Sequence, residues 1–345
     1  MKTDVASARA LASAMLRAAG MDAQPAARTA WALASAESWG RASHGLLRLP
    51  YYLERFSAGG SDPRAVLRLV RSTAVTAVLD GGNGLGHHHV FEASTKASAM
   101  AREHGLAAVA VANSGHCGVL GLYVEPMLDA GLVGIVLSTG PAVMPPPGGS
   151  SAVVSTSPIA AGIPMRPHAA VVDMAMSAVA RGRIAASAAA GEEIPAGWAF
   201  DADGVTTTDP REALAGLLAP LGGAKGFALA LVVESLTAGI VGPSLATEIA
   251  DPLDGSAIAA PQRIAHLVLA LDPACLDADG ASGDRLERLA ASVAAAGGRV
   301  PGARHRHTSE IADDDELTIP DRLASSLVAL AASLGVDPPG SFADR

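Results

Sequence analysis

Apolar residues recur with the period of an α-helix at both ends of the chain. The pattern predicts helices over residues 5–19 and 23–39, with Gly20 as the stop signal between them. Two or more helices with polar outer faces are predicted from 308 to 337. The apolar residues that define one face of the first helix are Val5, Leu11 and Met15. The chain therefore opens and closes with helical segments.

From about residue 70 the pattern changes to short apolar runs that are rich in β-branched residues. Runs of this kind, separated by glycine-rich turns or helix-like stretches, are typical of buried strands. The predicted strands are 72–80, 106–113, 132–139, 169–175 and 265–272. A long helix is expected after the motif PLGGAKG at 220–226. The alternation of strands and helices predicts an α/β core.

The composition narrows the class of protein. The 345 residues can bury one large core or two, and half of them are hydrophobic. No apolar run reaches the roughly 18 to 20 residues that a bilayer span needs, and Asp4 and Arg9 interrupt the N-terminal stretch where a secretory signal would lie. Cys117 and Cys275 are too few for a disulfide framework or a four-ligand zinc site. We expect a cytoplasmic protein without membrane contact.

The net charge of −9 disfavours a nucleic-acid partner, because phosphate backbones are bound by broad basic surfaces. One basic segment, RVPGARHRH at 299–307, departs from this balance. Its basic and imidazole side chains are Arg299, Arg304, His305, Arg306 and His307. Two interpretations stay open for this segment, a solvated loop and a small site for an anionic ligand.

A glycine cluster at Gly82, Gly84 and Gly86 stands between a predicted strand and a helix, as in a dinucleotide-binding loop. Its spacing differs from G-x-G-x-x-G, and the next strand lacks the acidic residue that would bind the ribose hydroxyls. We therefore predict a tight turn here and disfavour a Rossmann fold. PLGGAKG is also incomplete as a phosphate loop, because Gly226 follows Lys225 where Ser or Thr would bind magnesium. Lys225 at a glycine-rich helix start can still bind an anionic cofactor.

Three consecutive histidines, His87 to His89, suggest a metal site. Consecutive side chains point in different directions on a helix or a strand, so at most two of them could share one ion. No carboxylate cluster accompanies them at ligand spacing. We expect a surface or turn role without a bound metal, and keep a metal site as the less favoured alternative.

Two polar clusters carry candidate chemistry in a chain that is otherwise rich in alanine and leucine. SHGLLRLPYYL contains Ser43, His44, Arg48 and Tyr52, and NSGHCGVLGLY contains His116. On a helix, His44, Arg48 and Tyr52 would share one face, because they are four residues apart. Ser43 and His44 are adjacent, so their side chains would diverge on a regular element, and no G-x-S-x-G elbow is present. A serine hydrolase is therefore disfavoured.

Six motifs occur together and in this order: SHGLLRLPYYL, NSGHCGVLGLY, PPPGG, VVDMAMSAVARGRI, IPAGWAFDADGVTTTDP and PLGGAKGFALALVVE. From residue 5 to 335 the chain resembles the type 2 malate/L-lactate dehydrogenase superfamily, which includes sulfolactate and ureidoglycolate dehydrogenases and cyclic-imine carboxylate reductases. The resemblance implies a non-Rossmann, L-sulfolactate dehydrogenase-like NAD(P)-binding fold and a homodimer. We expect residues 1–70 to pack with 305–345 as a helical cap, and 71–304 to form a mixed α/β core that binds the cofactor.

The resemblance also implies roles for individual residues. His116, His44 and Ser43 would be catalytic, with His116 as the proton donor to a keto acid and His44 as the donor to an imine. The substrate-binding residues would be Arg48, Tyr52 and Thr156, with Arg48 clamping the substrate carboxylate. The cofactor-binding residues would be His116, Cys117, Gly118, Val119, Leu120, Val172, Asp173, Met174, Gly223, Ala224, Lys225, Gly302, Arg304, His305 and Arg306.

The chain departs from the family pattern at Cys117, at Gly140 and over 155–157. It also has only alanines and a serine over 185–190, where some imine reductases carry a carboxylate that completes a Ser-His relay.

The predicted function is hydride transfer between the nicotinamide of NAD or NADP and a small 2-hydroxy or 2-oxo acid of the malate, lactate or sulfolactate type. The enzyme alternative is a Δ1-pyrroline- or Δ1-piperideine-2-carboxylate reductase. The alternative from another class is a catalytically impaired protein that binds nicotinamide or carboxylate ligands.

Overall fold

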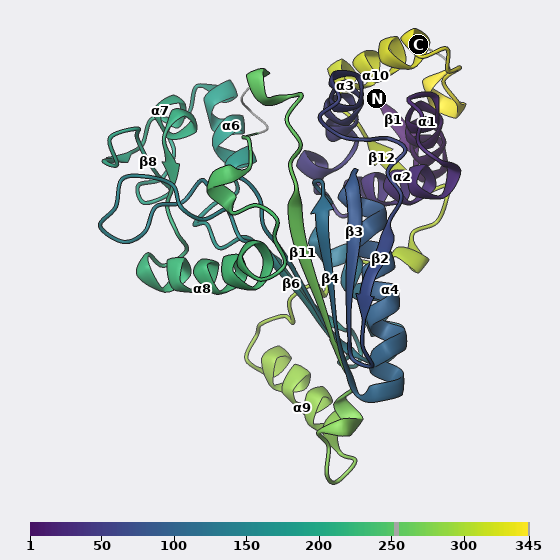
Figure 1. Cartoon of the computed structure of the whole chain (residues 1–345), viewed down its shortest axis with the longest axis vertical. Coiled ribbons are helices and arrows are strands. Elements are labelled where there is room, and N and C mark those ends of the chain that lie inside the picture. The colour runs from purple at the N-terminus through teal and green to yellow at the C-terminus, as the bar shows by residue number, and fades with distance from the viewer. Residues whose placement is uncertain (252–254, 344–345) are drawn as a thin grey trace.

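The computed structural model describes residues 1–251 and 255–343 and has a mixed α/β fold (Figure 1). A helical layer that contains both ends of the chain lies above a large sheet, and a smaller lobe lies beside the sheet. The predicted α/β class is confirmed.

The large sheet contains seven strands within the described residues. They are β2 (Arg68–Ser72), β3 (Thr76–Gly84), β4 (Leu106–Ser114), β11 (Ile264–Leu271), β5 (Val133–Ser138), β6 (Ile159–Ile163) and β7 (Ala170–Met174), in this spatial order. Only β3 and β4 pair in parallel, and the other neighbours pair antiparallel. The sequence predicted β3, β4, β5, β7 and β11 and missed the other two strands.

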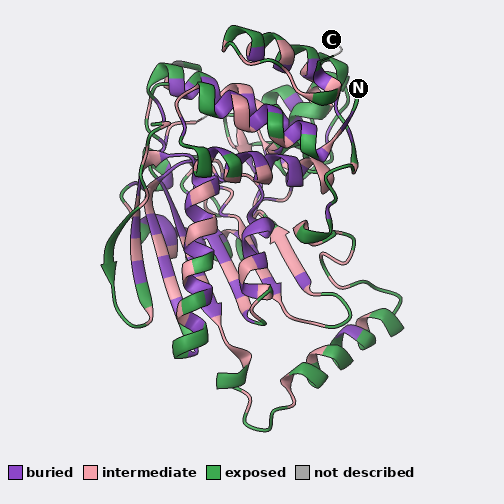
Figure 2. Cartoon of the chain, turned by 90° about the vertical axis from the view of Figure 1, so that its right-hand side faces the viewer, coloured by how far each residue is buried: buried purple, intermediate pink, exposed green. Residues whose placement is uncertain are grey.

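The parallel pair is joined by α4 (Gly86–His104), which packs its alanines against the sheet. Figure 2 shows α4 lying along the strands, with exposed residues on its outer side. The tight turn expected before the helix consists of Leu85 alone, because β3 continues to Gly84 through a bulged segment and α4 begins at Gly86. Gly82 and Asn83 adopt φ values of 56° and 65° inside that bulge, and the pairing with β4 shifts register between Asp80 and Gly84.

The helical layer combines α1 (Val5–Ala18), α2 (Ala23–Ser38) and α3 (Leu49–Ala58) with α10 (Asp321–Ser333). β1 (Lys2–Asp4) pairs antiparallel with β12 (Glu316–Thr318) and ties the two ends of the chain together. The shared apolar core includes Leu11, Met15, Leu33, Tyr52, Leu327 and Phe342. The two helices predicted near the N-terminus are therefore confirmed. The boundaries expected at residues 70 and 304 stay a prediction, and residues 344–345 of the expected cap lie outside the described residues.

The prediction of two or more helices over 308–337 is wrong. Within that range α10 is an α-helix, whereas Thr308–Glu310 forms a single 3-10 turn. The carbonyls of Asp313 and Asp315 accept hydrogen bonds from the amides of Ala6 and Val5, at 2.9 and 3.1 Å. The backbone of this stretch thus binds the open start of α1 and is unavailable for a helix of its own.

The smaller lobe has a separate apolar core, which includes Met144, Val154, Ile184, Ile194 and Leu218. Its helices are α6 (Arg181–Ala190), α7 (Pro210–Ala215) and α8 (Ala224–Glu234), and its strands are β8 (Ala199–Phe200), β9 (Thr206–Thr207) and β10 (Leu217–Leu218). The sequence predicted α8 alone as a distinct element of this lobe. The strands were missed because each is two residues long, too short to carry a period.

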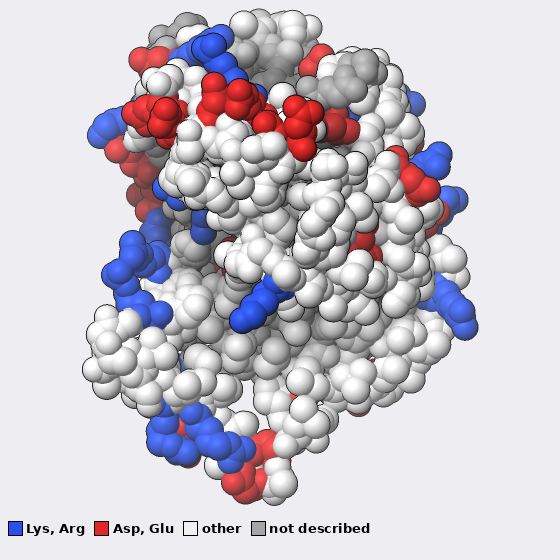
Figure 3. All heavy atoms as spheres, turned by 90° about the vertical axis from the view of Figure 1, so that its left-hand side faces the viewer, with Lys and Arg blue, Asp and Glu red and all other residues white. Residues whose placement is uncertain are grey.

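The outer face of α8 and of the turn after it is apolar. Leu229, Val232 and Ile240 are 54%, 55% and 75% exposed. Figure 3 views the molecule from the side of the lobe and shows few charged side chains across the centre of that face. Leu229, Val232 and Ile240 are therefore large apolar side chains that the folded chain leaves open to water.

At the end of the sheet that lies away from the helical layer, α9 (Ser282–Ala295) projects from the rest of the molecule (Figure 1). Its buried residue is Ala290. None of the helices in the described part of the chain combines the length and the apolar character of a bilayer span.

Candidate active site

The segment that contains Ser43 and Arg48 is built from two 3-10 turns, Ala42–His44 and Leu46–Arg48, followed by α3. Gly45 separates the turns with φ −94° and ψ −143°, so His44, Arg48 and Tyr52 do not lie on one continuous helix. The carboxylate of Glu37 accepts the amide of Leu46 at 2.8 Å. A Cβ atom on Gly45 would lie 2.3 Å from the same carboxylate, so a larger residue at position 45 would have to displace the Glu37 side chain.

The break at Gly45 brings neighbouring side chains together. The hydroxyl of Ser43 lies 3.0 Å from Nδ1 of His44, so the expectation that these adjacent side chains diverge is wrong. The 3-10 turn ends at His44, so the directions of these two side chains are not fixed by the geometry of a continuing helix. Nε of Arg48 donates to the carbonyl of Ser43 at 2.8 Å. Arg48 is thereby anchored beside the Ser43–His44 pair.

His116 joins this group from the loop after β4. Its Nδ1 lies 2.7 Å from the hydroxyl of Tyr52, and its ring stacks on that of His44 with centroids 5.6 Å apart. Tyr52 is fully buried, so the contact between its hydroxyl and His116 is shielded from solvent. Residues from two distant parts of the chain, 43–52 and 116, therefore form one cluster.

The hydrogen bonds of His116 define its tautomer. The amide of Gly118 donates to Nδ1 at 3.3 Å, and an amide cannot accept. Nδ1 therefore carries a lone pair, and the proton of the neutral ring lies on Nε2. Burial above all, and then the charge of Arg48, hold the pKa of His116 well below 6.5. His116 is thus a neutral ring that presents an N–H group.

His44 is also neutral. Burial lowers its pKa to about 4, with further lowering by the charges of Arg48 and Arg41. Burial has the opposite effect on Tyr52 and raises the pKa of its hydroxyl, which therefore stays protonated and can donate to His116. The cluster combines two neutral imidazoles, a phenol and one permanent positive charge.

The three consecutive histidines lie in the first turn of α4, beneath this cluster. The expected surface or turn role is wrong, because His87 and His89 are 0% and 3% exposed. Nδ1 of His89 lies 3.0 Å from the hydroxyl of Ser114. The ring of His87 lies 5.3 Å from that of Tyr52, and neither of its nitrogens has a hydrogen-bond partner within the described residues. The described residues contain no group of three or more His, Cys, Asp or Glu placed to hold a metal ion.

β7 connects the other predicted site residues. Asp173 accepts the amide of Gly121 at 3.2 Å, which fixes the loop of Cys117 to Leu120 against the strand. Burial raises the pKa of this carboxyl group.

The residues just beyond β7 connect it to two further predicted segments. The amide of Met176 donates to the carbonyl of Thr156 at 2.8 Å, and the carbonyl of Met176 accepts a hydrogen bond from the amide of Leu221 at 2.8 Å. Asp173 lies in β7 between Val172 and Met174. The start of α8, two residues after Leu221, contains the predicted cofactor residues Gly223, Ala224 and Lys225.

The basic segment lies against β7 and the helical layer. The amide of Val171 donates to the carbonyl of Pro301 at 2.9 Å, and a Cβ atom on Gly302 would lie 2.7 Å from that of Val171. Gly302 has φ 81°, so both backbone conformation and space require glycine here. The ring of His305 stacks on Trp39 with centroids 4.8 Å apart. These contacts place Gly302 and His305 near the predicted cofactor residues of β7.

The two predicted arginines of this segment differ in their surroundings. Arg306 forms an ion pair with Asp315 at 2.6 Å. Arg304 is exposed, and within the described residues it forms neither an ion pair nor a side-chain hydrogen bond. A cavity of about 450 Å³ is lined by residues 299–305 and includes Gly302, Arg304 and His305.

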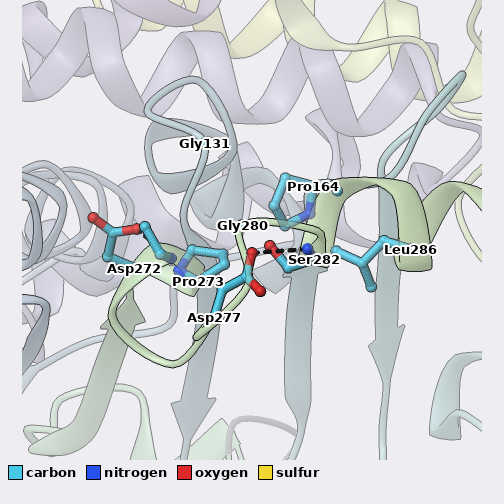
Figure 4. Close-up of a pocket in the computed structure, with 10 residues that line it drawn as sticks. Gly131, Pro164, Asp272, Pro273, Asp277, Gly280, Ser282 and Leu286 are labelled. Atoms are coloured by element: carbon cyan, nitrogen blue, oxygen red, sulfur yellow. Dashed lines mark hydrogen bonds between the residues drawn. The ribbon is translucent and has the colours of Figure 1, made fainter.

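A second cavity of about 390 Å³ lies beside α9 (Figure 4). Asp277 and Ser282 are joined there by a hydrogen bond, and Pro164 and Leu286 supply apolar walls. None of the residues predicted for catalysis or cofactor binding lines it. This cavity is therefore distinct from the histidine cluster.

Comparison with known proteins identifies the family of this chain. The sequence profile of the malate/L-lactate dehydrogenase family matches residues 3–328. The chain belongs to this family. The predicted superfamily is thereby confirmed, as is the prediction of an oxidoreductase.

Individual family members are similar over nearly the whole chain. The (2R)-3-sulfolactate dehydrogenase (NADP(+)) of Chromohalobacter salexigens is 40% identical over 328 residues, which cover 94% of this chain and 97% of that one. The Δ(1)-pyrroline-2-carboxylate reductase of Ancylobacter novellus is 32% identical over 338 residues, which cover 96% of this chain and 97% of that one. The solved structure of sulfolactate dehydrogenase from Methanocaldococcus jannaschii has a TM-score of 0.87 and 28% identity, covering 97% of this chain and 98% of that one. Both predicted enzyme classes, and the use of a nicotinamide cofactor, are thus represented among the relatives of this malate/L-lactate dehydrogenase family member.

The sequence analysis did not select three residues that lie beside the predicted site residues. Trp39 stacks on His305 and donates from Nε1 to the carbonyl of Arg306 at 2.9 Å. Arg41 follows Trp39 by two residues, and the ring of His87 packs against that of Tyr52. The rarity of tryptophan in this chain, with three residues in all, was the one available signal.

Proposed function

We propose that this dehydrogenase family member reduces small 2-oxo acids, and oxidises the matching 2-hydroxy acids, with NADP or NAD. The observation that supports this most is the meeting of His44, His116 and Tyr52 around the anchored guanidinium of Arg48. A proton donor beside a fixed positive charge suits a substrate whose carboxylate is next to the reacting carbon. The sulfolactate and malate dehydrogenases among the relatives support the same substrate class.

The surroundings of β7 are consistent with a dinucleotide cofactor. Arg304 and Lys225 are exposed cationic side chains that suit its phosphates, and Asp173 offers a carboxylate acceptor beside the loop of 117–120. The cofactor supplies the hydride when it is bound. The residues proposed to hold it are those predicted from the family resemblance, together with Trp39.

We propose that Arg48 binds the substrate carboxylate and that this contact controls the proton. The positive charge of Arg48 lowers the pKa of both His116 and His44. A bound carboxylate compensates that charge, so the pKa of each histidine rises when substrate arrives. His116 can then take up a proton at Nδ1, the atom that faces the Tyr52 hydroxyl, and deliver its Nε2 proton to the oxygen that becomes the alcohol, which leaves the ring neutral. Tyr52 acts on this step through His116, because its hydroxyl contacts only the Nδ1 side of that ring.

A cyclic-imine reductase is the second candidate, and the Ser43–His44 hydrogen bond supports it. That pair is the part of a relay that would protonate an imine nitrogen. The start of α6 lies beside it, since a Cβ atom on Gly182 would be 3.6 Å from that of Ser43. The α6 residues 185–190 supply no carboxylate to complete the relay, which favours the 2-oxo acid.

We also propose that the protein works as a homodimer in the cytoplasm. The apolar outer face of α8 supports a contact with a second copy, because burial of Leu229 and Val232 would remove a large apolar surface from water. The exposed free thiol of Cys275 suits a reducing compartment. Light scattering of the wild type and of Leu229→Lys tests the dimer, which the substitution should dissociate; a wild-type monomer would contradict it.

A substrate panel tests the proposed activity. Purified protein is mixed with NADPH or NADH and with pyruvate, oxaloacetate, sulfopyruvate, Δ1-pyrroline-2-carboxylate or Δ1-piperideine-2-carboxylate, and absorbance at the nicotinamide band is followed. We expect the fastest turnover with a 2-oxo acid. Faster turnover of an imine would transfer the proposal to the second candidate. Cofactor binding without turnover of any substrate would support the catalytically impaired binding protein.

A further inference from the structure

Arg41 lies in the chain between two parts of the proposed site. Two residues before it, Trp39 stacks on His305 and bonds to the basic segment. Just after it come Ser43 and His44, and the amide of His44 donates to the Arg41 carbonyl at 2.8 Å. The backbone of Arg41 is held from the other side as well, because its amide donates to the carbonyl of Ala36 at 2.7 Å. The residue is therefore fixed at the junction of the catalytic cluster and the cofactor region.

Asp173 completes the surroundings of this junction. The amide of Gly121 bonds to Asp173, and a Cβ atom on Gly121 would lie 3.2 Å from both Asp173 and Trp39. The β7 carboxylate and the indole thus both lie close to the position that a Cβ atom of Gly121 would occupy. Arg41, on the turn that follows Trp39, is close enough for its charge to lower the pKa of three groups, His44, Asp173 and His305.

The guanidinium of Arg41 makes no hydrogen bond and no ion pair within the described residues, and the residue is exposed. Asp173 does not neutralise it, because no contact between the two falls within ion-pair distance and Asp173 is already bonded to an amide. The other arginines near the cluster are engaged differently, since Arg48 is bonded to Ser43 and Arg306 to Asp315. Arg41 is thus a positive charge without a partner of its own, at the place where substrate and cofactor would meet.

We propose that Arg41 binds an oxyanion that takes no part in the reaction, either the distal carboxylate or sulfonate of a dianionic substrate or a phosphate of the cofactor. This inference rests on the proposed function, since it assigns Arg41 to ligands of the same site. A planar guanidinium offers two parallel donors to carboxylate, sulfonate or phosphate oxygens. With Arg48 on the carboxylate beside the reacting carbon, a second fixed cation would favour acids that carry two negative charges.

Binding measurements distinguish the two sources of the oxyanion and do not depend on turnover. Calorimetry gives the Kd of NADPH and of NADH, and then the Kd of malate and of lactate in the presence of NADPH, with which 2-hydroxy acids cannot react. The proteins compared are the wild type, Arg41→Gln, Arg41→Lys and the control Arg17→Gln. Arg17 is an exposed arginine in the last turn of α1 and belongs to no part of the site.

If Arg41 binds the distal group of the substrate, Arg41→Gln weakens malate binding roughly 10- to 100-fold and leaves lactate unchanged. If it binds a cofactor phosphate, the same variant weakens NADPH binding by a similar factor. Loss for NADPH alone then identifies the 2′-phosphate, and equal loss for NADH identifies the pyrophosphate. Arg41→Lys should recover part of either loss, because it keeps the charge without the fork.

The inference is overturned if Arg41→Gln binds NADPH and malate within twofold of the wild type and of Arg17→Gln, or if the wild type binds neither ligand. Failure of the proposed function has a different signature, which is the absence of turnover in the substrate panel by a wild type that binds these ligands.

Discussion

Substitution of Arg48 by lysine tests how the proposed site holds its substrate. The change keeps the positive charge but removes the planar fork and the Nε–H group. In the wild type that Nε–H group donates to the carbonyl of Ser43 at 2.8 Å and fixes the guanidinium plane. The terminal amino groups of Arg48 are then left to face a ligand. A lysine would keep the charge near His44 and His116 while losing both the anchor and the second parallel hydrogen bond.

The expected loss follows from these contacts. A charge-assisted hydrogen bond in a partly desolvated site is worth roughly 1.5 to 3 kcal/mol, and the lost anchor adds to this. A total of about 1.5 to 4 kcal/mol corresponds to a decrease in kcat/KM on the order of 10- to 1,000-fold. Because the charge survives, the pH dependence of the reaction should change little. The Kd of NADPH should also stay close to the wild-type value.

Steady-state kinetics with the best substrate of the panel, together with a fluorescence titration of NADPH, measure both quantities. Arg17→Lys in α1 is the matched control and should behave as the wild type. An unchanged kcat/KM in Arg48→Lys would refute the assignment of Arg48 to the substrate carboxylate. A loss confined to NADPH binding would instead move Arg48 to the cofactor.

Other substitutions test the remaining parts of the account. His116→Ala should lower kcat roughly 10²- to 10⁴-fold, and far more than it weakens NADPH binding, because positioned acid-base groups contribute about that much; a near-native kcat would remove His116 from the role. Arg304→Ala should weaken NADPH binding more than Arg306→Ala, since Arg306 is held in an ion pair, and an unchanged Kd in both variants would return the segment to a solvated loop. In urea unfolding, His87→Leu should cost less stability than His89→Leu, because His89 alone has a hydrogen-bond partner within the described residues, and the reverse order would contradict this. Burial lowers the pKa of both rings to about 3, so the free energy of unfolding should fall as the pH is lowered from 6.5 towards 3, and each substitution should flatten that fall.

Much of the central sheet could be predicted from the sequence because its strands are apolar runs of β-branched residues. β6 escaped notice because Ile159–Ile163 has two alanines and a glycine between its isoleucines. Gly162 is needed there by packing, since a Cβ atom would lie 2.9 Å from Val124, and no local pattern reveals such a contact. α9 was not predicted either, because this helix projects from the rest of the molecule and buries little apolar surface.

The candidate site was predictable where motif and chemistry agreed. The family motifs named Ser43, His44 and His116, and the structure brings their rings and hydroxyl together. The local geometry of residues 42–48 was less predictable, because the spacing of the polar residues does not show that Gly45 interrupts the helix. A surface or turn role is predicted for His87 because consecutive imidazoles point in different directions and no carboxylate cluster accompanies them. Its burial depends on α4 packing beneath Tyr52, which is a long-range contact.

The central claim is that this protein transfers hydride directly between a nicotinamide and the carbon beside a substrate carboxylate. Deuterium labelling tests it most directly. NADPH carrying deuterium on one or the other face of C4 is incubated with the wild type and the best substrate of the panel, and the product is analysed by mass spectrometry and NMR. The account predicts one deuterium at C2 of the product from one face of the cofactor and none from the other. A product without deuterium from either labelled face would contradict it.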